Sequence, residues 1–150
     1  MRLVRIAGSW WRIEAKHPDD WTWAPFPTPR NRFDPMSGRF RVRYAANRPA
    51  VAARERFPGR LITPVQGEYW LVELGGGALA LPLTRQANLD TLRLDDRIST
   101  GRIDVDRRSD PDPLLGTCAS LADAVYDWWG GRPPPLVYRS RTTPGVGRNL

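Results

Sequence analysis

The residues best suited to chemistry lie in residues 31–57, where an arginine, a tyrosine and a glutamate occur close together. Arg32 falls in a predicted loop, and its guanidinium is a planar array of donors that suits an anionic phosphate group. Glu55 falls on a predicted helix, on the same face as Val51 and Ala52. A carboxylate on a face of small residues points toward protein rather than water. Either an ion pair or a function must therefore account for it.

The local sequence predicts a strand, a sharp turn and a helix around these residues. Residues 40–45 alternate in side-chain type, as a half-buried strand does, and Tyr44 lies near the end of that strand. Asn47 is a good N-cap and Pro49 fits a first helical turn. The helix would then run from residue 50 to Glu55, so one compact unit would carry all three side chains.

Each of these residues also has a purely structural interpretation. Arg32 could be a surface residue that stabilises the turn at Asp34-Pro35. Tyr44 could be a core tyrosine whose hydroxyl reaches the rim. Glu55 could form an ion pair with an arginine beside it on the helix or on a strand. The residues alone leave these alternatives open.

A second motif lies near the C-terminus, in Tyr138-Arg139-Ser140-Arg141. Tyr138 and Ser140 are two residues apart, so both leave the same face of a strand predicted over residues 136–141. A helix is predicted before this strand from apolar residues at helical spacing and from two glycines that end it. These residues are Cys118, Leu121, Ala122, Val125 and Trp129, followed by Gly130 and Gly131. Trp128-Trp129 are expected in the core at the end of this helix.

Several short elements are predicted elsewhere: strands at residues 2–6 and 9–13, an ordered proline-rich loop over 18–35, and a hairpin in which Gly75 to Gly77 join residues 69–74 to 78–83. The loop is expected to be ordered because exposure of Trp21, Trp23 and Phe26 would be costly. Residues 84–112 are polar and match no element. Several strands with two helices predict an α+β fold in a single domain over residues 1–150.

Composition excludes several classes of function. The single cysteine, Cys118, excludes an intramolecular disulfide framework and fits a reducing cytosol. One histidine, His17, argues against a His/Cys metal site and against a Ser-His-Asp triad. No apolar run approaches a membrane span, and the N-terminus lacks the apolar core of a signal peptide, so we expect a cytoplasmic protein. The net charge of +7 comes almost entirely from scattered arginines, which makes direct nucleic-acid binding the weaker interpretation.

In these motifs the chain resembles the RES domain, the toxin half of bacterial Xre–RES toxin–antitoxin pairs, which is named for an arginine, a glutamate and a serine. The family's first motif is an arginine before an aromatic and an Asn/Asp-Pro, then a strand ending in tyrosine, then a helix with the glutamate. Arg32-Phe33-Asp34-Pro35, Tyr44 and Glu55 match it, and Tyr138-Arg139-Ser140-Arg141 match the family's last motif. The resemblance runs from about Trp11 to the end. Two parts depart from it: residues 84–112 match nothing, and the chain stops at Asn149-Leu150, where the family usually continues into an apolar segment.

The resemblance implies a fold related to ADP-ribosyltransferases, with split mixed or antiparallel sheets that clamp a dinucleotide. It implies that Arg32, Glu55 and Ser140 are catalytic and that Arg32, Tyr44, Tyr138 and Arg12 bind NAD, without a metal. NAD would be a substrate rather than a cofactor. Its nicotinamide–ribose bond would be broken, with water, phosphate or a protein side chain as the acceptor, so the enzyme would be a glycohydrolase, a phosphorylase or an ADP-ribosyltransferase.

Family resemblance also implies a partner, an Xre-like antitoxin that blocks the NAD cleft and carries the DNA-binding function. A homodimer is a further expectation. The alternatives are a mono-ADP-ribosyltransferase acting on a protein target, a basic nucleic-acid-binding module without catalysis, and a RES-like domain that has lost its activity.

Overall fold

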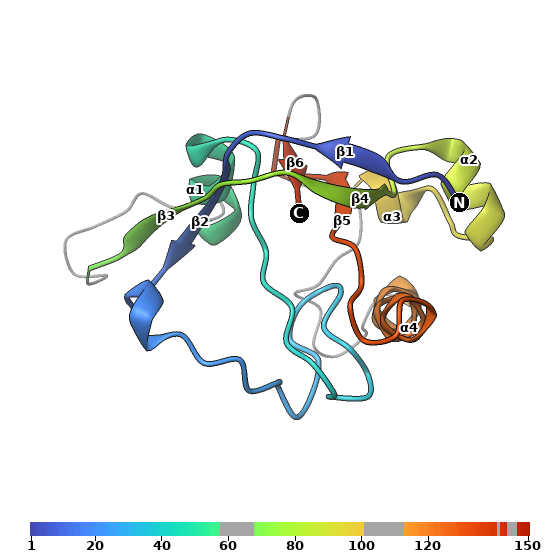
Figure 1. The fold of residues 1–150 in the computed structure, drawn as a ribbon, viewed down its shortest axis with the longest axis horizontal. Coiled ribbons are helices and arrows are strands. Elements are labelled where there is room, and N and C mark those ends of the chain that lie inside the picture. Colours follow the sequence, from blue (N-terminus) through green and yellow to red (C-terminus); the bar gives the residue numbers. More distant parts are fainter. Residues whose placement is uncertain (58–67, 101–112, 141, 144–146) are drawn as a thin grey trace. The chain divides into compact units, whose positions relative to one another are not determined.

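The computed structural model describes residues 1–57, 68–100, 113–140, 142–143 and 147–150. Its strands and helices follow one another along the chain (Figure 1): β1 Val4–Ile6, β2 Trp10–Glu14, η1 Pro18–Asp20, α1 Pro49–Arg56, β3 Trp70–Leu74, β4 Ala78–Pro82, α2 Gln86–Leu92, α3 Arg97–Thr100, α4 Pro113–Trp128, β5 Leu136–Arg139 and β6 Arg148–Asn149. Helices beside mixed and antiparallel strands confirm the α+β prediction.

These elements form two compact units. The first, the sheet unit, contains the first 21 residues, the chain from Tyr44 to the end of α3, and the chain from Pro135 onward. The second, the helix unit, contains Thr22–Arg43 and α4. The organisation of the chain as a single functional domain stays a prediction.

The sheet unit is built on two sheets, one with the strand order β1-β4-β5-β6 and one that pairs β2 with β3. β1 and β4 are antiparallel, as are β2 and β3, whereas β4 and β5 are parallel. Val4 of β1 pairs with Ala80 of β4, and Trp10 of β2 pairs with Leu74 of β3. The segment that carries β1 and β2 therefore runs antiparallel to the segment that carries β3 and β4. In Figure 1 these segments run side by side, with β1 continuing into β2 and β3 into β4.

The predicted hairpin of residues 69–74 with 78–83 is therefore wrong. β3 and β4 follow each other along one segment and pair with β2 and β1, not with each other. Gly75 to Gly77 lie where this segment passes from one sheet to the other, and a Cβ on Gly77 would be 3.4 Å from the Ile6 carbonyl oxygen. A glycine run permits a bend as well as a turn, and the local sequence does not distinguish them.

The predicted strand over residues 40–45 is also wrong, because only Ala46 forms bridges, one to Trp11 and one to Asn149. Helix α1 begins at Pro49, as predicted, but its N-cap is Arg48 rather than Asn47. The Asn47 side chain instead accepts a hydrogen bond from the Arg148 backbone N–H, at 2.9 Å. A long-range partner has replaced the local cap.

Small apolar residues hold α1 against the sheet unit. Val51 and Ala52 are buried with Ala46, and Trp11 and Ile13 of β2 pack against them. A second cluster joins Trp10, Ala45, Ala80 and Val137, so strands β2, β4 and β5 share one core. The prediction that Val51 and Ala52 face inward is confirmed. Glu55 lies on the same face of α1, so its side chain also points toward the protein.

In the helix unit, α4 confirms the predicted helix and its buried stripe. Gly130 and Gly131 follow it with φ of 58° and 81°, which only glycine adopts easily, and they end the helix as predicted. The buried face consists of Leu114, Cys118, Ala119, Leu121, Ala122 and Val125.

Two predictions of buried tryptophans are wrong. Trp128 is 53% exposed, although the sequence suggested a core position, and Trp23 in the proline-rich loop is 67% exposed. Arg43 lies over the Trp23 ring at 4.6 Å and donates to the Thr22 carbonyl at 2.6 Å. A guanidinium thus covers one ring face in place of apolar packing.

Candidate active site around Glu55

Glu55 lies in the last turn of α1 and is part-buried. Its Oε1 accepts three hydrogen bonds, from Ser140 Oγ at 2.5 Å, Thr142 Oγ1 at 3.1 Å and Asn149 Nδ2 at 3.2 Å. All three donors come from the chain after β5, far from Glu55 in sequence. The structure thus brings together two of the residues singled out from the sequence, Glu55 and Ser140.

Backbone contacts of Ser140, Thr143 and Gly147 place the Ser140 donor. Ser140 follows β5 directly, and its backbone N–H donates to the Gly147 carbonyl at 3.0 Å. Gly147 donates to the Thr143 carbonyl at 2.8 Å, and the Thr143 N–H donates to Ser140 Oγ at 3.1 Å. The Ser140 hydroxyl is therefore both a donor to Glu55 and an acceptor from the backbone, in a fully buried position.

Gly147 has no room for a side chain. A Cβ there would be 2.8 Å from Ser140 Cβ and 2.8 Å from the Thr143 carbonyl oxygen. Both distances are shorter than ordinary van der Waals contacts. Glycine at this position lets the chain pass close enough to Ser140 for the serine to reach Glu55.

The three donors at Glu55 Oε1 are neutral. Hydroxyl and amide donors fix the position of a carboxylate without adding a positive charge beside it. An oriented carboxylate that keeps its negative charge can stabilise a positive charge that develops nearby during a reaction.

Arg12 and Tyr44 lie together in the sheet unit. Arg12 donates through one terminal nitrogen to the Tyr44 carbonyl at 2.6 Å, and through Nε to Glu14 at 2.5 Å. The Arg12 guanidinium also forms an ion pair with Glu14. Arg12 thus ties the backbone of residue 44 to β2, just ahead of α1. Tyr138 is buried in β5, opposite Asn149 of β6.

Arg32 lies in the helix unit, and it is 6% exposed. Its loop is organised by Asp34, whose Oδ2 accepts from the backbone N–H groups of Arg30 and Asn31 at 3.0 and 2.9 Å. The alternative interpretation of Arg32 as a surface residue is therefore wrong, and Asp34 contributes to holding the turn. Because burial of a guanidinium costs free energy, its position calls for a specific role.

Sequence reasoning missed two groups of this site, Thr142 and Asn149. Thr142 could have been noticed as a second hydroxyl residue two positions after Ser140. Asn149 gave no local signal, since it reaches Glu55 only through the pairing of β6 with β5.

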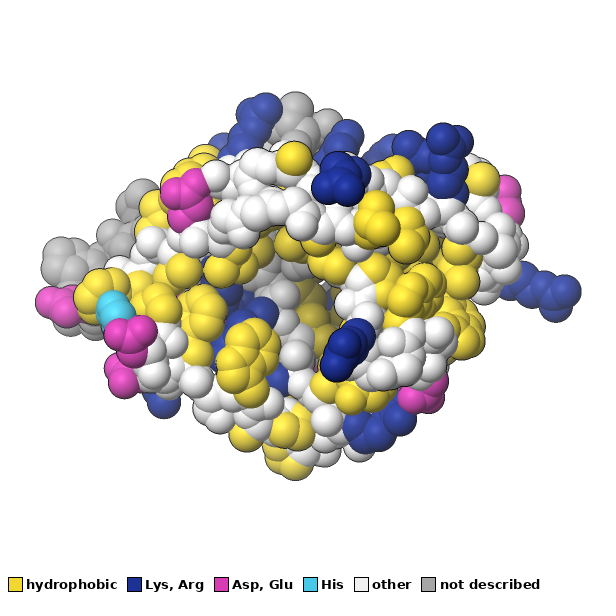
Figure 2. Space-filling model, in the orientation of Figure 1, with side chains coloured by type: hydrophobic (Ala, Val, Ile, Leu, Met, Phe, Trp, Pro, Cys, Tyr) yellow, Lys and Arg dark blue, Asp and Glu magenta, His cyan; other side chains and the backbone are white. Residues whose placement is uncertain are grey.

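Outside this site, the described residues form no metal-binding cluster and no membrane-spanning helix. Within the described ranges, no group of three or more His, Cys, Asp or Glu side chains could hold a metal ion. His17 lies at the surface beside acidic side chains (Figure 2), pairs with Asp19 at 3.3 Å and meets the Trp70 ring edge-on. No helix in the part of the chain that the structure describes is long and apolar enough to cross a bilayer.

Comparison with known proteins identifies the family of the chain. The family model described as the RES domain matches residues 9–150. No curated protein and no solved structure matches the chain at a significant level. RES domains are related to ADP-ribosyltransferase-like enzymes and are typically the toxin component of toxin–antitoxin systems, which supports an NAD-related enzymatic role and an antitoxin partner in general. The chain belongs to the RES domain family.

Proposed function

We propose that this chain is a RES-type toxin that binds NAD and breaks the nicotinamide–ribose bond. The observation that carries the proposal is the Glu55 carboxylate, which three neutral donors hold in one orientation at the end of α1. Family membership supplies the substrate class, and the arrangement around Glu55 supplies the chemical group that such a reaction requires.

In the proposed reaction the bond between the ribose anomeric carbon and the nicotinamide nitrogen breaks. The bonding electron pair stays on that nitrogen, so nicotinamide leaves neutral and positive charge develops on the ribose as an oxocarbenium-like centre. A fixed carboxylate near this centre lowers the free energy of the transition state. An oxygen of water or phosphate then forms the new bond to the anomeric carbon. Water gives up a proton, and phosphate gives a phosphorylated ADP-ribose.

The remaining residues take supporting roles in this proposal. Arg32 would bind the pyrophosphate, because its guanidinium can donate two parallel hydrogen bonds. Tyr44 and Tyr138 offer an aromatic face or a hydroxyl to the nicotinamide ribose end. Arg12 would act through Tyr44, whose carbonyl it holds. Ser140 would orient Glu55 through the hydrogen bond that it donates.

The decisive measurement is nicotinamide release from NAD by purified protein, with and without phosphate. Release that phosphate accelerates, with a phosphorylated product, identifies a phosphorylase, whereas ADP-ribose in either condition identifies a glycohydrolase. Radiolabel transferred to protein identifies an ADP-ribosyltransferase. An Arg32→Ala protein that folds normally should lose the activity. No consumption of NAD under any of these conditions would refute the proposal.

The same proposal predicts an effect in cells. Expression of the wild-type chain without its antitoxin should lower cellular NAD and arrest growth, and expression of Glu55→Gln should do neither. Growth arrest at normal NAD would instead favour modification of a protein target.

A nucleic-acid-binding module is the second candidate, and one observation favours it. Arg41 and Arg43 lie over the rings of Phe26 and Trp23 at 4.2 and 4.6 Å, and Trp23 is largely exposed. Exposed aromatic rings beside arginines can stack on bases.

Thermal melting of Glu55→Gln separates the two candidates. NAD at a hundred times its dissociation constant should add about 2.7 kcal/mol to the free energy of unfolding. Protection by an oligonucleotide that survives moderate salt, with none from NAD, would favour the second candidate.

A further inference from the structure

Asn149 presents a buried acceptor beside Glu55 that the protein does not use. Its Nδ2 donates to Glu55 Oε1 at 3.2 Å, and its side chain is 6% exposed. Its Oδ1 is fully shielded from solvent and has no hydrogen-bond partner among the residues that the structure describes. Buried polar atoms without partners are rare in folded proteins and often mark functional positions.

The orientation of this amide follows from chemistry. A carboxylate oxygen can only accept, so the amide nitrogen must face Glu55, and a flipped amide would bring two acceptors together. The position of Oδ1 is therefore fixed by the same contact that holds Glu55.

The backbone of Asn149 is fixed by pairing with two neighbouring segments. Asn149 pairs with Tyr138 on one side and bridges Ala46 on the other. The next residue, Leu150, exchanges two backbone hydrogen bonds with Ala45, at 3.0 and 2.7 Å. The unused acceptor is thus held in place by strand pairing on both edges of β6.

An unsatisfied buried carbonyl destabilises the protein, and a ligand that donates a hydrogen bond to it recovers that free energy. Glu55 and Asn149 are in contact, so their carboxylate and carbonyl oxygens are two acceptors on neighbouring side chains. A vicinal diol carries two hydroxyl donors on neighbouring carbons and matches this pair. A ribose ring is the part of a nucleotide that carries such a diol.

We propose that Asn149 recognises a hydroxyl of the ribose whose bond to nicotinamide is cleaved. Its Oδ1 accepts a hydrogen bond from this hydroxyl, and its Nδ2 holds Glu55 beside the same ribose ring. Asn149 is then a specificity-determining residue that distinguishes ribose from its deoxy forms. This inference rests on the proposed NAD cleavage.

The test combines a protein change with a substrate change. Wild type and Asn149→Ala are assayed with NAD and with the analogues that lack either hydroxyl of the nicotinamide ribose. Loss of a hydrogen bond to a buried group should lower kcat/KM about ten- to a hundredfold. For the wild type, kcat/KM should be lower by this factor with one of the two analogues than with NAD. For Asn149→Ala, kcat/KM with NAD should already be lower by this factor, and removal of the same hydroxyl from the substrate should lower it little further. Arg148→Ala, an exposed neighbour on β6, is the matched control and should behave as wild type.

The outcomes separate this inference from the function on which it rests. Cleavage of NAD with additive effects of the two changes would overturn the role of Asn149 and leave the proposed function intact. The same holds if wild type cleaves both deoxy analogues as fast as NAD, a result that does not depend on the folding of any variant. A wild-type protein that neither binds nor cleaves NAD would overturn both.

Discussion

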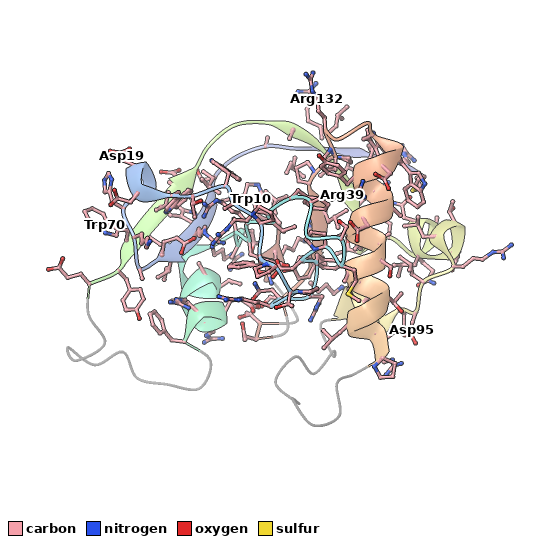
Figure 3. The ribbon with its side chains drawn as sticks, turned by 90° about the horizontal axis from the view of Figure 1, so that it is seen from below. Trp10, Asp19, Arg39, Trp70, Asp95 and Arg132 are labelled. Carbon is pink, nitrogen blue, oxygen red and sulfur yellow. The ribbon has the colours of Figure 1, made fainter. Side chains whose placement is uncertain are left out.

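Glu55 in the sheet unit and Asp127 in the helix unit are both carboxylates held by several donors, but the donors differ. Asp127 accepts two hydrogen bonds from Arg39, at 2.7 and 3.0 Å, in an exposed position on α4. Figure 3 shows Arg39 directed at this helix. The hydrogen bonds and charge of Arg39 lower the pKa of the Asp127 carboxyl below its usual value, and Asp127 in turn raises the pKa of Arg39.

Arg39 has a structural role in the helix unit. Arg39 also lies 3.4 Å from Asp123, and Ser37 donates to that carboxylate, so the contacts fasten the loop around residue 38 to α4. An arginine that binds an aspartate fixes its position and cancels its charge. Serine, threonine and asparagine side chains, which carry no charge, donate to Glu55 Oε1. The two carboxylates thus differ in these donors, an arginine at Asp127 and uncharged side chains at Glu55 Oε1.

The strongest test of this comparison removes one charge at a time. Glu55→Gln keeps an acceptor oxygen for the three donors but loses the negative charge, so nicotinamide release should fall about a hundredfold or more. Asp127→Asn removes a charge of the same kind from the helix unit and should cleave NAD at the wild-type rate. Equal activity of Glu55→Gln and wild type would show that Glu55 is structural, as Asp127 is.

A second change disturbs the hydrogen bond that Ser140 donates to Glu55. Gly147→Ala forces a methyl group against Ser140 and the Thr143 carbonyl, and overpacking of this kind costs about 1–3 kcal/mol of unfolding free energy. Ser140 should also shift away from Glu55, so activity should fall together with stability. Urea unfolding and nicotinamide release on the same preparation measure the two effects. Normal stability of this variant would mean that Gly147 has more free space around it than the structure indicates.

The matched change in the helix unit has the opposite sign. Gly116 lies in α4, and a Cβ there would have nothing within 4 Å. Gly116→Ala should therefore stabilise the protein by about 0.5–1 kcal/mol, because alanine loses less backbone entropy in a helix. Urea unfolding measures the gain, and activity should not change. A loss of stability would contradict the free space around this position.

The smallest expected effect is the pH dependence of the Arg39–Asp127 pair. The folded pKa of Asp127 is lowered, so the pair stabilises the fold above the usual aspartate value of about 3.9. That contribution is lost as the pH falls through the lowered, folded value. Wild type should melt slightly above Asp127→Asn at neutral pH, and the gap should close in acid. It should also shrink in high salt, because the pair is exposed. A gap that persists in strong acid would exclude this ionic origin.

The sequence predicted the elements whose causes are local. Pro49 and the small residues after it predict α1, and the apolar stripe with Gly130 and Gly131 predicts α4. Val51 and Ala52 are buried, and their spacing places Glu55 on the same face of α1. This explains why the Glu55 carboxylate points inward.

The errors share a different cause. Gly75 to Gly77 look like a turn in the local sequence, but the long pairing of β1 and β2 with β4 and β3 makes them a bend. Asn47 looks like a cap, but Arg148 takes its side-chain oxygen. Each of these outcomes depends on a partner far along the chain, as does the contact of Asn149 with Glu55.

The contact between Glu55 and Asn149 spans 94 residues, and this separation has a kinetic consequence. Closure of so long a loop must precede any gain from the contact, so pairings of this kind form slowly relative to helices and local turns. Helix α1 can carry its carboxylate early, while the serine, threonine and asparagine that orient it are still absent. If Glu55 acts as proposed, a freshly made molecule would be inert until β6 pairs with β5, and its activity would report completed folding rather than the mere presence of the chain.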